Sequence, residues 1–148
     1  MLIKWDPSKV EEGISGTFSR TINDADLVLH AGITGDTNPL YLDEEHARSR
    51  KFGHRFAPPA LVIGIMHAAY SAKIASLQDG VVTEAEYRFF APLRVGDTGT
   101  ARATVSRVNT IEKKVTVQLT CTNQLGGKIA EGHVVLLPAP PLADRKSE

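Results

Sequence analysis

Cysteine, net charge and long apolar runs are all scarce or absent in this chain of 148 residues. The single cysteine, Cys121, excludes an intramolecular disulfide. Because Cys121 occupies an apolar position in a strand-like stretch, we predict a core residue rather than a reactive thiol. Seventeen basic side chains balance seventeen acidic ones. The chain therefore lacks the overall charge that would favour nucleic acid or an anionic membrane as a partner.

Segments that target or anchor a protein are also missing from the pattern. The opening residues, MLIKWDPSKV, contain no apolar core of a secretory signal. The longest apolar stretch is interrupted well before the ~18 residues that a membrane span requires. We expect a soluble, cytoplasmic protein with a single domain, whose core covers about residues 13–138 and whose residues 139–148 form a flexible tail.

Five segments have the composition and punctuation of β-strands. They are residues 13–22, 81–91, 99–109, 114–124 and 128–138. The fourth gives the clearest signal, because its apolar residues alternate with threonine and glutamine in a period of two. The turn sequences LRVGD and NQLGG predict that the last four strands follow one another as an antiparallel meander.

The segment ALVIGIMHAAYSAKIASL, residues 60–77, predicts a helix of about five turns. Pro58 and Pro59 stand where a helix start tolerates proline. So few polar residues interrupt the segment that most of its surface must be covered. We therefore predict an α+β fold in which an antiparallel sheet wraps around one long central helix. Such a sheet keeps an edge strand and an open face, and dimerisation would cover them.

A helix-and-loop excursion is expected between the first strand and the long helix. Asn23 or Asp24 would cap a short helix that ends near GITGD, residues 32–36. Asp43 would cap a second short helix within LDEEHARSR, where acidic residues suit the first turn. The polar cluster GDTNPLY, residues 35–41, lies between these two helices.

Two longer blocks, GDTNPLYLDEEHARSRKFGHRFAPPAL and RFFAPLRVGDTGTARATV, resemble the MaoC-like dehydratase family over roughly residues 15–138. This family includes (R)-specific enoyl-CoA hydratases and (R)-3-hydroxyacyl thioester dehydratases. The resemblance implies a hot-dog fold, a homodimer or double hot-dog, and reversible addition of water to a trans-2-enoyl thioester in fatty-acid or related acyl metabolism. It implies no metal and no redox cofactor, because the coenzyme A or acyl-carrier group arrives with the substrate.

In that family, an aspartate and a histidine five positions later hold the reacting water. The matching positions here are Asp36 and Tyr41, with Asn38 as an orienting neighbour and Pro39 beside it in the substrate-binding turn. Asp36 could be the base if a dry pocket raises its pKa, or it could only cap the turn. Tyr41 is a poor base at neutral pH. It could position the water, act as the acid, or form one wall of an inactive pocket.

The family's oxyanion donor is a glycine N–H in a His-Gly-Met-like turn before the long helix, and the matching residues here are Pro58 and Pro59. Proline has no N–H, so the amide of Ala60 in the first helical turn is the substitute donor. His54 is the candidate replacement for the missing base, with an exposed loop histidine as the alternative.

A basic cluster of Arg48, Arg50, Lys51 and Arg55 surrounds the entrance loop. It could simply be solvated, or it could contact the phosphates of coenzyme A or phosphopantetheine. His67 in the long helix is expected to be a satisfied core group. The spacing of the histidines predicts no metal site.

Two other functions stay open. A hot-dog thioesterase commonly has a carboxylate on its central helix, and residues 60–77 contain none. A catalytically impaired acyl-thioester-binding chain, or the binding half of a heterodimeric dehydratase, would fit Tyr41 and Pro59. Asp36 and Asn38 favour the enzyme instead.

Overall fold

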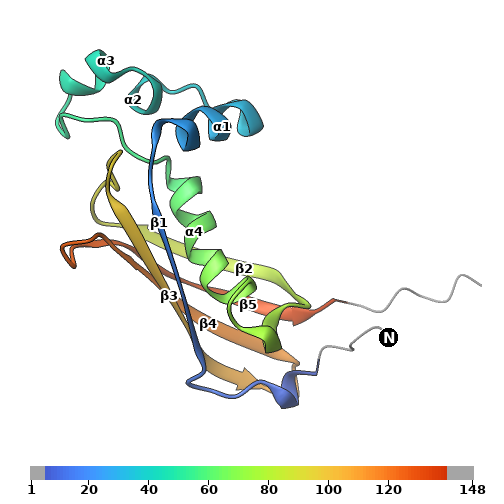
Figure 1. The fold of residues 1–148 in the computed structure, drawn as a ribbon. Coiled ribbons are helices and arrows are strands. Elements are labelled where there is room, and N and C mark those ends of the chain that lie inside the picture. Colours follow the sequence, from blue (N-terminus) through green and yellow to red (C-terminus); the bar gives the residue numbers. More distant parts are fainter. Residues whose placement is uncertain (1–5, 140–148) are drawn as a thin grey trace, which may run out of the picture.

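The computed structural model describes residues 6–139, and its framework is an antiparallel sheet with one helix lying along it (Figure 1). The strands take the order β1-β3-β4-β5-β2. Their bounds are β1 (Ser15–Thr21), β2 (Gly80–Phe89), β3 (Thr98–Asn109), β4 (Lys114–Thr122) and β5 (Lys128–Pro138). All five segments with strand patterns therefore form strands.

The connection between β2 and β3 differs from the prediction. β3, β4 and β5 follow one another as a meander, but β2 pairs with β5 rather than with β3. The segment after β2 pairs elsewhere, because Phe56 bridges to Arg94 and Ala57 N–H donates to Leu93 O at 2.7 Å. LRVGD is thus a crossing loop, and the predicted hairpin there is wrong.

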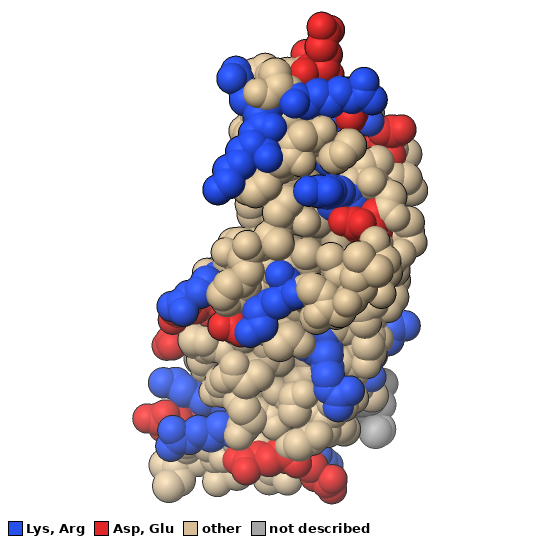
Figure 2. Space-filling view, turned by 90° about the vertical axis from the view of Figure 1, so that its left-hand side faces the viewer, with Lys and Arg blue, Asp and Glu red and all other residues tan. Residues whose placement is uncertain are grey.

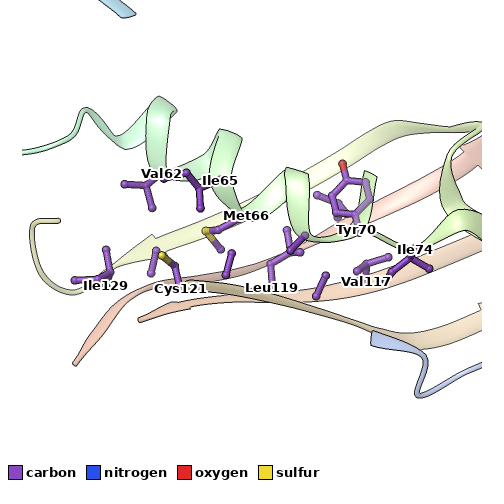
Figure 3. Packing of buried hydrophobic residues seen from close by; sticks show 14 of the residues in the cluster. Val62, Ile65, Met66, Tyr70, Ile74, Val117, Leu119, Cys121 and Ile129 are labelled. Carbon is purple, nitrogen blue, oxygen red and sulfur yellow. The ribbon is translucent and has the colours of Figure 1, made fainter. Parts of the chain in front are cut away.

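The helix α4 (Pro59–Ser71) packs against β1, β3 and β4. Figure 3 shows Met66 and its neighbours on α4 directed at Leu119 and Cys121 of β4. Met66 and Cys121 have no exposed surface, and burial raises the pKa of the Cys121 thiol to about 11. The prediction that Cys121 is a core residue is confirmed.

The predicted C-terminal end of α4 is wrong. The helix stops at Ser71, and a separate short 3-10 turn, η2 (Ala75–Leu77), follows it. The break lets Ile74 and Leu77, each 1% exposed, enter the core. Burial of these two side chains explains why the chain leaves the helix despite good helical residues.

Both edge strands of the sheet, β1 and β2, and one strip of α4 are open in the described chain. β2 is exposed along most of its length, and its outer edge pairs with no strand among residues 6–139. On α4, Ala60, Gly64 and Ser71 form an exposed strip because positions i, i+4 and i+11 share a helix face. The expected edge strand and open face are both present.

We call residues 24–56 the overhang, because Figure 1 shows these helices beyond the N-terminal end of α4. The overhang contains α1 (Asp24–Thr34), α2 (Pro39–Leu42), α3 (Glu44–Arg48) and the loop that follows. Asn23 caps α1 in a reciprocal capping box with Asp26. Asp43 caps α3 as predicted, whereas α2 was not predicted.

Asp26 also fastens the overhang to the sheet. Its side chain is 5% exposed and pairs with Arg20 of β1. Burial alone would raise the pKa of Asp26, but the hydrogen bonds from Arg20 and Asn23 hold it below its usual value. Leu27 of α1 is 1% exposed and belongs to the same buried core cluster as the sheet and α4.

No helix between residues 6 and 139 is long and apolar enough to cross a bilayer. The tail expected at residues 139–148 lies, apart from Ala139, outside the described residues.

Candidate active site

The turn that carries Asp36 begins where α1 ends. Gly35 adopts a left-handed backbone with φ 76°. The Asp36 carboxylate accepts a hydrogen bond from Asn38 N–H at 3.3 Å, and Asn38 Oδ1 in turn caps α2 by accepting from Leu40 N–H at 3.0 Å. Asp36 therefore does cap its turn. Its side chain is exposed, so a single chain does not surround it with a dry pocket.

Tyr41 lies on α2, one helical turn beyond Asn38, and is half-buried. Its ring meets Phe56 edge-on, with 5.4 Å between the ring centroids. Burial and the negative charge of Asp36 both raise the pKa of Tyr41. A phenol is already protonated at neutral pH without this shift, so the hydroxyl can donate a hydrogen bond.

An apolar pocket of about 190 Å³ adjoins this aromatic contact. Its walls include Phe52, Phe56, Pro59, Val62, Phe89 and Phe90. Because Phe56 both lines the pocket and contacts Tyr41, the tyrosine stands near its rim. Sequence reasoning missed these phenylalanines. The signal was the recurrence of aromatic residues before Ala-Pro, in RFAP and in RFFAP.

The start of α4 offers one backbone donor. Pro58 is the N-cap and Pro59 the first helical residue, while Leu61 N–H already donates to Pro58 O at 3.0 Å. Ala60 N–H has no acceptor among the described residues. It lies at the positive end of the helix dipole, and its role as an oxyanion donor stays a prediction.

The basic side chains of the entrance loop differ in how they are engaged. Arg48 is 71% exposed and lies 3.4 Å from a carboxylate oxygen of Glu44, and the Lys51 ammonium lies over the ring of Phe52. Figure 2 shows basic and acidic side chains intermixed at the upper end of the molecule, with no block of one sign. Arg48 and Lys51 remain candidates for contacting phosphate.

Arg55 has a different position. It is 17% exposed, its Nε donates to Glu44 Oε2 at 2.8 Å, and its Nη2 donates to Asp24 Oδ1. These hydrogen bonds raise the pKa of Arg55. One guanidinium thus joins the starts of α1 and α3, and we assign it to the overhang's framework rather than to a phosphate. Sequence reasoning missed this network because Asp24 lies 31 positions from Arg55.

His54 is exposed, and its Nδ1 lies 3.7 Å from Glu44 Oε1. No contact between His54 and Asp36 occurs in the described chain. His67, by contrast, hydrogen-bonds to Tyr70 and Tyr87, which confirms that its nitrogens are satisfied, but it is half-buried and lies outside the core cluster. Among residues 6–139, no group of three or more potential ligands could bind a metal ion.

Comparison with known proteins assigns the chain to a family. A family model described as "MaoC like domain" matches residues 7–125. The chain belongs to the MaoC-like dehydratase family. One MaoC-like relative, the (R)-specific enoyl-CoA hydratase of Rhodospirillum rubrum, is 34% identical over 132 residues, which is 88% of this chain and 90% of the relative.

Solved structures confirm the hot-dog fold. R-hydratase PhaJ1 from Pseudomonas aeruginosa superimposes with a TM-score of 0.80 at 22% identity, covering 95% of this chain and 96% of that one. A chain of the HadBC complex, a 3R-hydroxyacyl-ACP dehydratase from Mycobacterium tuberculosis, gives a TM-score of 0.67 at 18% identity and covers 87% and 98%. This fold therefore occurs in an R-hydratase and in a chain of a 3R-hydroxyacyl-ACP dehydratase complex.

Proposed function

We propose that this chain is a hydro-lyase that adds water reversibly to trans-2-enoyl thioesters and releases it from (R)-3-hydroxyacyl thioesters. The observation that carries the proposal is the pairing of an exposed carboxylate, Asp36, with the hydroxyl of Tyr41, which lies within range of its charge and is protonated at neutral pH. Hydration requires a base for water and a donor that orients it. These two side chains supply both groups.

In the proposed reaction, the Asp36 carboxylate removes a proton from a water molecule that Tyr41 orients. The water oxygen forms a bond to C3 of the enoyl group, and the double-bond electrons move to the thioester carbonyl. Asp36 then returns the proton to C2, so that one water has been added. Dehydration follows the same steps in reverse.

The carbonyl oxygen gains negative charge during this addition. Ala60 N–H has no acceptor between residues 6 and 139 and lies at the N-terminus of a helix of 13 residues, where a developing anion is stabilised. Pro59 cannot contribute a second donor. We assign the oxyanion contact to Ala60.

The remaining assignments concern the substrate and the assembly. The apolar pocket beside Phe56 would take acyl carbons, while Arg48 and Lys51 could meet phosphates of coenzyme A or of a carrier protein's phosphopantetheine. The open edge of β2 and the exposure of Asp36 support a homodimer, because a second copy could pair with β2 and help to dry the site.

The purified protein should hydrate crotonyl-CoA, which is followed by loss of the enoyl-thioester absorbance. Asp36→Asn should lower the rate by about 10²–10⁴-fold. Asparagine keeps an oxygen that can accept from Asn38 N–H, so the turn should survive, and an unchanged melting temperature would establish this. Activity that persists in a folded Asp36→Asn protein would contradict the assignment.

A second function is favoured by the absence of an N–H at Pro59: an impaired acyl-thioester-binding chain, or the binding half of a heterodimer. This alternative predicts acyl-CoA binding without turnover over a range of acyl lengths, and turnover only after a second, complementary chain is added. A thioesterase with its carboxylate on the central helix has no support, because α4 contains no Asp or Glu.

A further inference from the structure

A polar cluster lies in the middle of α4, away from Asp36. His67 is half-buried between two tyrosines: its Nδ1 lies 3.0 Å from Tyr70 Oη, and its Nε2 hydrogen-bonds to Tyr87 Oη of β2. Tyr87 reaches α4 because its partner on β5 is Gly132. A Cβ at Gly132 would lie 2.7 Å from the ring of Tyr87. The position of the Tyr87 ring therefore depends on the absence of a side chain at Gly132.

The number of protons in the cluster shows which of the two tyrosine hydroxyls has a hydrogen left to donate to a ligand. Burial lowers the pKa of His67, so the imidazole is neutral at pH 7 and has one N–H and one acceptor nitrogen. One tyrosine must donate to the acceptor nitrogen, while the other accepts from the N–H. The tyrosine that accepts retains a hydrogen atom for which the cluster provides no acceptor.

The two tyrosines differ in burial, and this difference determines which of them donates a hydrogen bond to His67 and which accepts one. Tyr70 is 4% exposed and hydrogen-bonds only to His67 among the described residues. A buried hydroxyl hydrogen without an acceptor is costly, so Tyr70 donates to Nδ1 and the Nε2–H of His67 donates to Tyr87. The hydroxyl hydrogen of Tyr87, which is only half-buried, is left to donate outward.

The cluster lies within reach of an acyl chain bound at the proposed site. His67 is seven residues beyond Ala60 on the same face of α4, a rise of about 10 Å. Phe89, which lines the apolar pocket, and Tyr87 are two residues apart and therefore share one face of β2. Between them, Gly64 is exposed and has open space beside it, since a Cβ there would meet nothing within 4 Å.

The geometry points to Tyr87, oriented by His67 and Tyr70, as a specificity-determining donor for an uncharged oxygen, a hydroxyl or a keto group, on the acyl chain about 10 Å from the thioester carbonyl. This inference rests on the proposed acyl-thioester function. A carboxylate is disfavoured, because no Lys or Arg of the described chain contacts the cluster and an unpaired buried charge is expensive.

The test measures binding, so that it does not depend on turnover. Octanoyl-CoA and ω-hydroxyoctanoyl-CoA have no double bond to hydrate, and titration calorimetry gives the ratio of their dissociation constants. The wild type should prefer the hydroxylated chain, and Tyr87→Phe should lower that preference by about 3- to 10-fold. Thr83→Val removes a hydroxyl from the same strand and should leave the ratio unchanged.

A spectroscopic measurement checks the proton arrangement directly. In protein with ¹⁵N-labelled histidine, the shifts of His67 should report the Nε2–H tautomer at neutral pH. The Nδ1–H tautomer would overturn the inference, as would equal ratios in the wild type and Tyr87→Phe, or no binding of either acyl-CoA. If discrimination persists while crotonyl-CoA hydration is absent, only the proposed reaction fails.

Discussion

The overhang and the sheet with its helix are held together by different forces. In the sheet and α4, apolar side chains such as Met66, Leu119 and Val117 are fully buried in one cluster. In the overhang, α1 exposes Val28, Leu29 and Ile33 to solvent, and polar contacts through Asp26 and Arg55 position the helices.

This difference separates stability from activity. Apolar burial supplies most of the free energy of folding, so the sheet and α4 determine whether the chain folds. The proposed reacting groups, Asp36 and Tyr41, lie in the overhang, where changes can alter geometry without emptying the core. We therefore expect substitutions in the two regions to have separable effects.

The largest expected effect on stability comes from the core. Leu119→Ala removes a side chain that is 1% exposed and should lower the free energy of unfolding by about 2–5 kcal/mol. Ile33→Ala in α1 is the matched control, since Ile33 is 83% exposed, and should change it by less than about 0.5 kcal/mol. Urea denaturation of both variants gives the two values, and similar losses would erase the contrast between the regions.

A smaller loss in the free energy of unfolding is expected where Asp26 of the overhang contacts Arg20 of β1. Asp26→Ala removes the capping box and the pair with Arg20, and should cost about 1–3 kcal/mol. Because the folded-state pKa of Asp26 is lowered, its contribution is present above its unfolded value of 3.8 and is lost as pH falls through the folded value. The difference in urea midpoint between wild type and variant should therefore shrink in acid, and a constant difference would exclude the ionised pair as its source.

The smallest effect on stability, but a clear effect on rate, is expected at Arg55. Arg55→Met frees Asp24 and Glu44, and displacement of the turn should lower kcat by about 10- to 100-fold with a smaller change in KM. Arg55→Lys keeps the charge but not the forked donors and should recover only part of the rate. A rise in KM at constant kcat would instead make Arg55 a phosphate contact.

Local patterns predicted most of the fold. The alternation of Val115, Val117, Leu119 and Cys121 directly reflects which face of β4 is buried, and the cap at Asp43 depends on neighbouring residues alone. The pairing of β2 with β5 and the early end of α4 could not be predicted, because both depend on which distant residues compete for the same partners.

For the candidate site, the family resemblance and motif spacing assigned Asp36, Tyr41 and Ala60, and these roles stay predictions. The structure brings Tyr41 within range of the charge of Asp36. The clamp at Arg55 and the His67–Tyr87 contact join separate elements of the fold, and no spacing rule connects such residues. Interactions within about five residues are visible in a sequence, whereas those between elements are not.

The two prolines at the start of α4 have a further consequence, for rigidity. Each ring fixes its own φ near −65°, so the first turn of the helix has few alternative conformations even before a thioester arrives. Pro58 is buried, which restrains the turn from the other side. Neither proline has an N–H, so Ala60 supplies the first donor of the helix, and in the proposed reaction its fixed direction would reduce the entropy lost when a carbonyl oxygen binds to it.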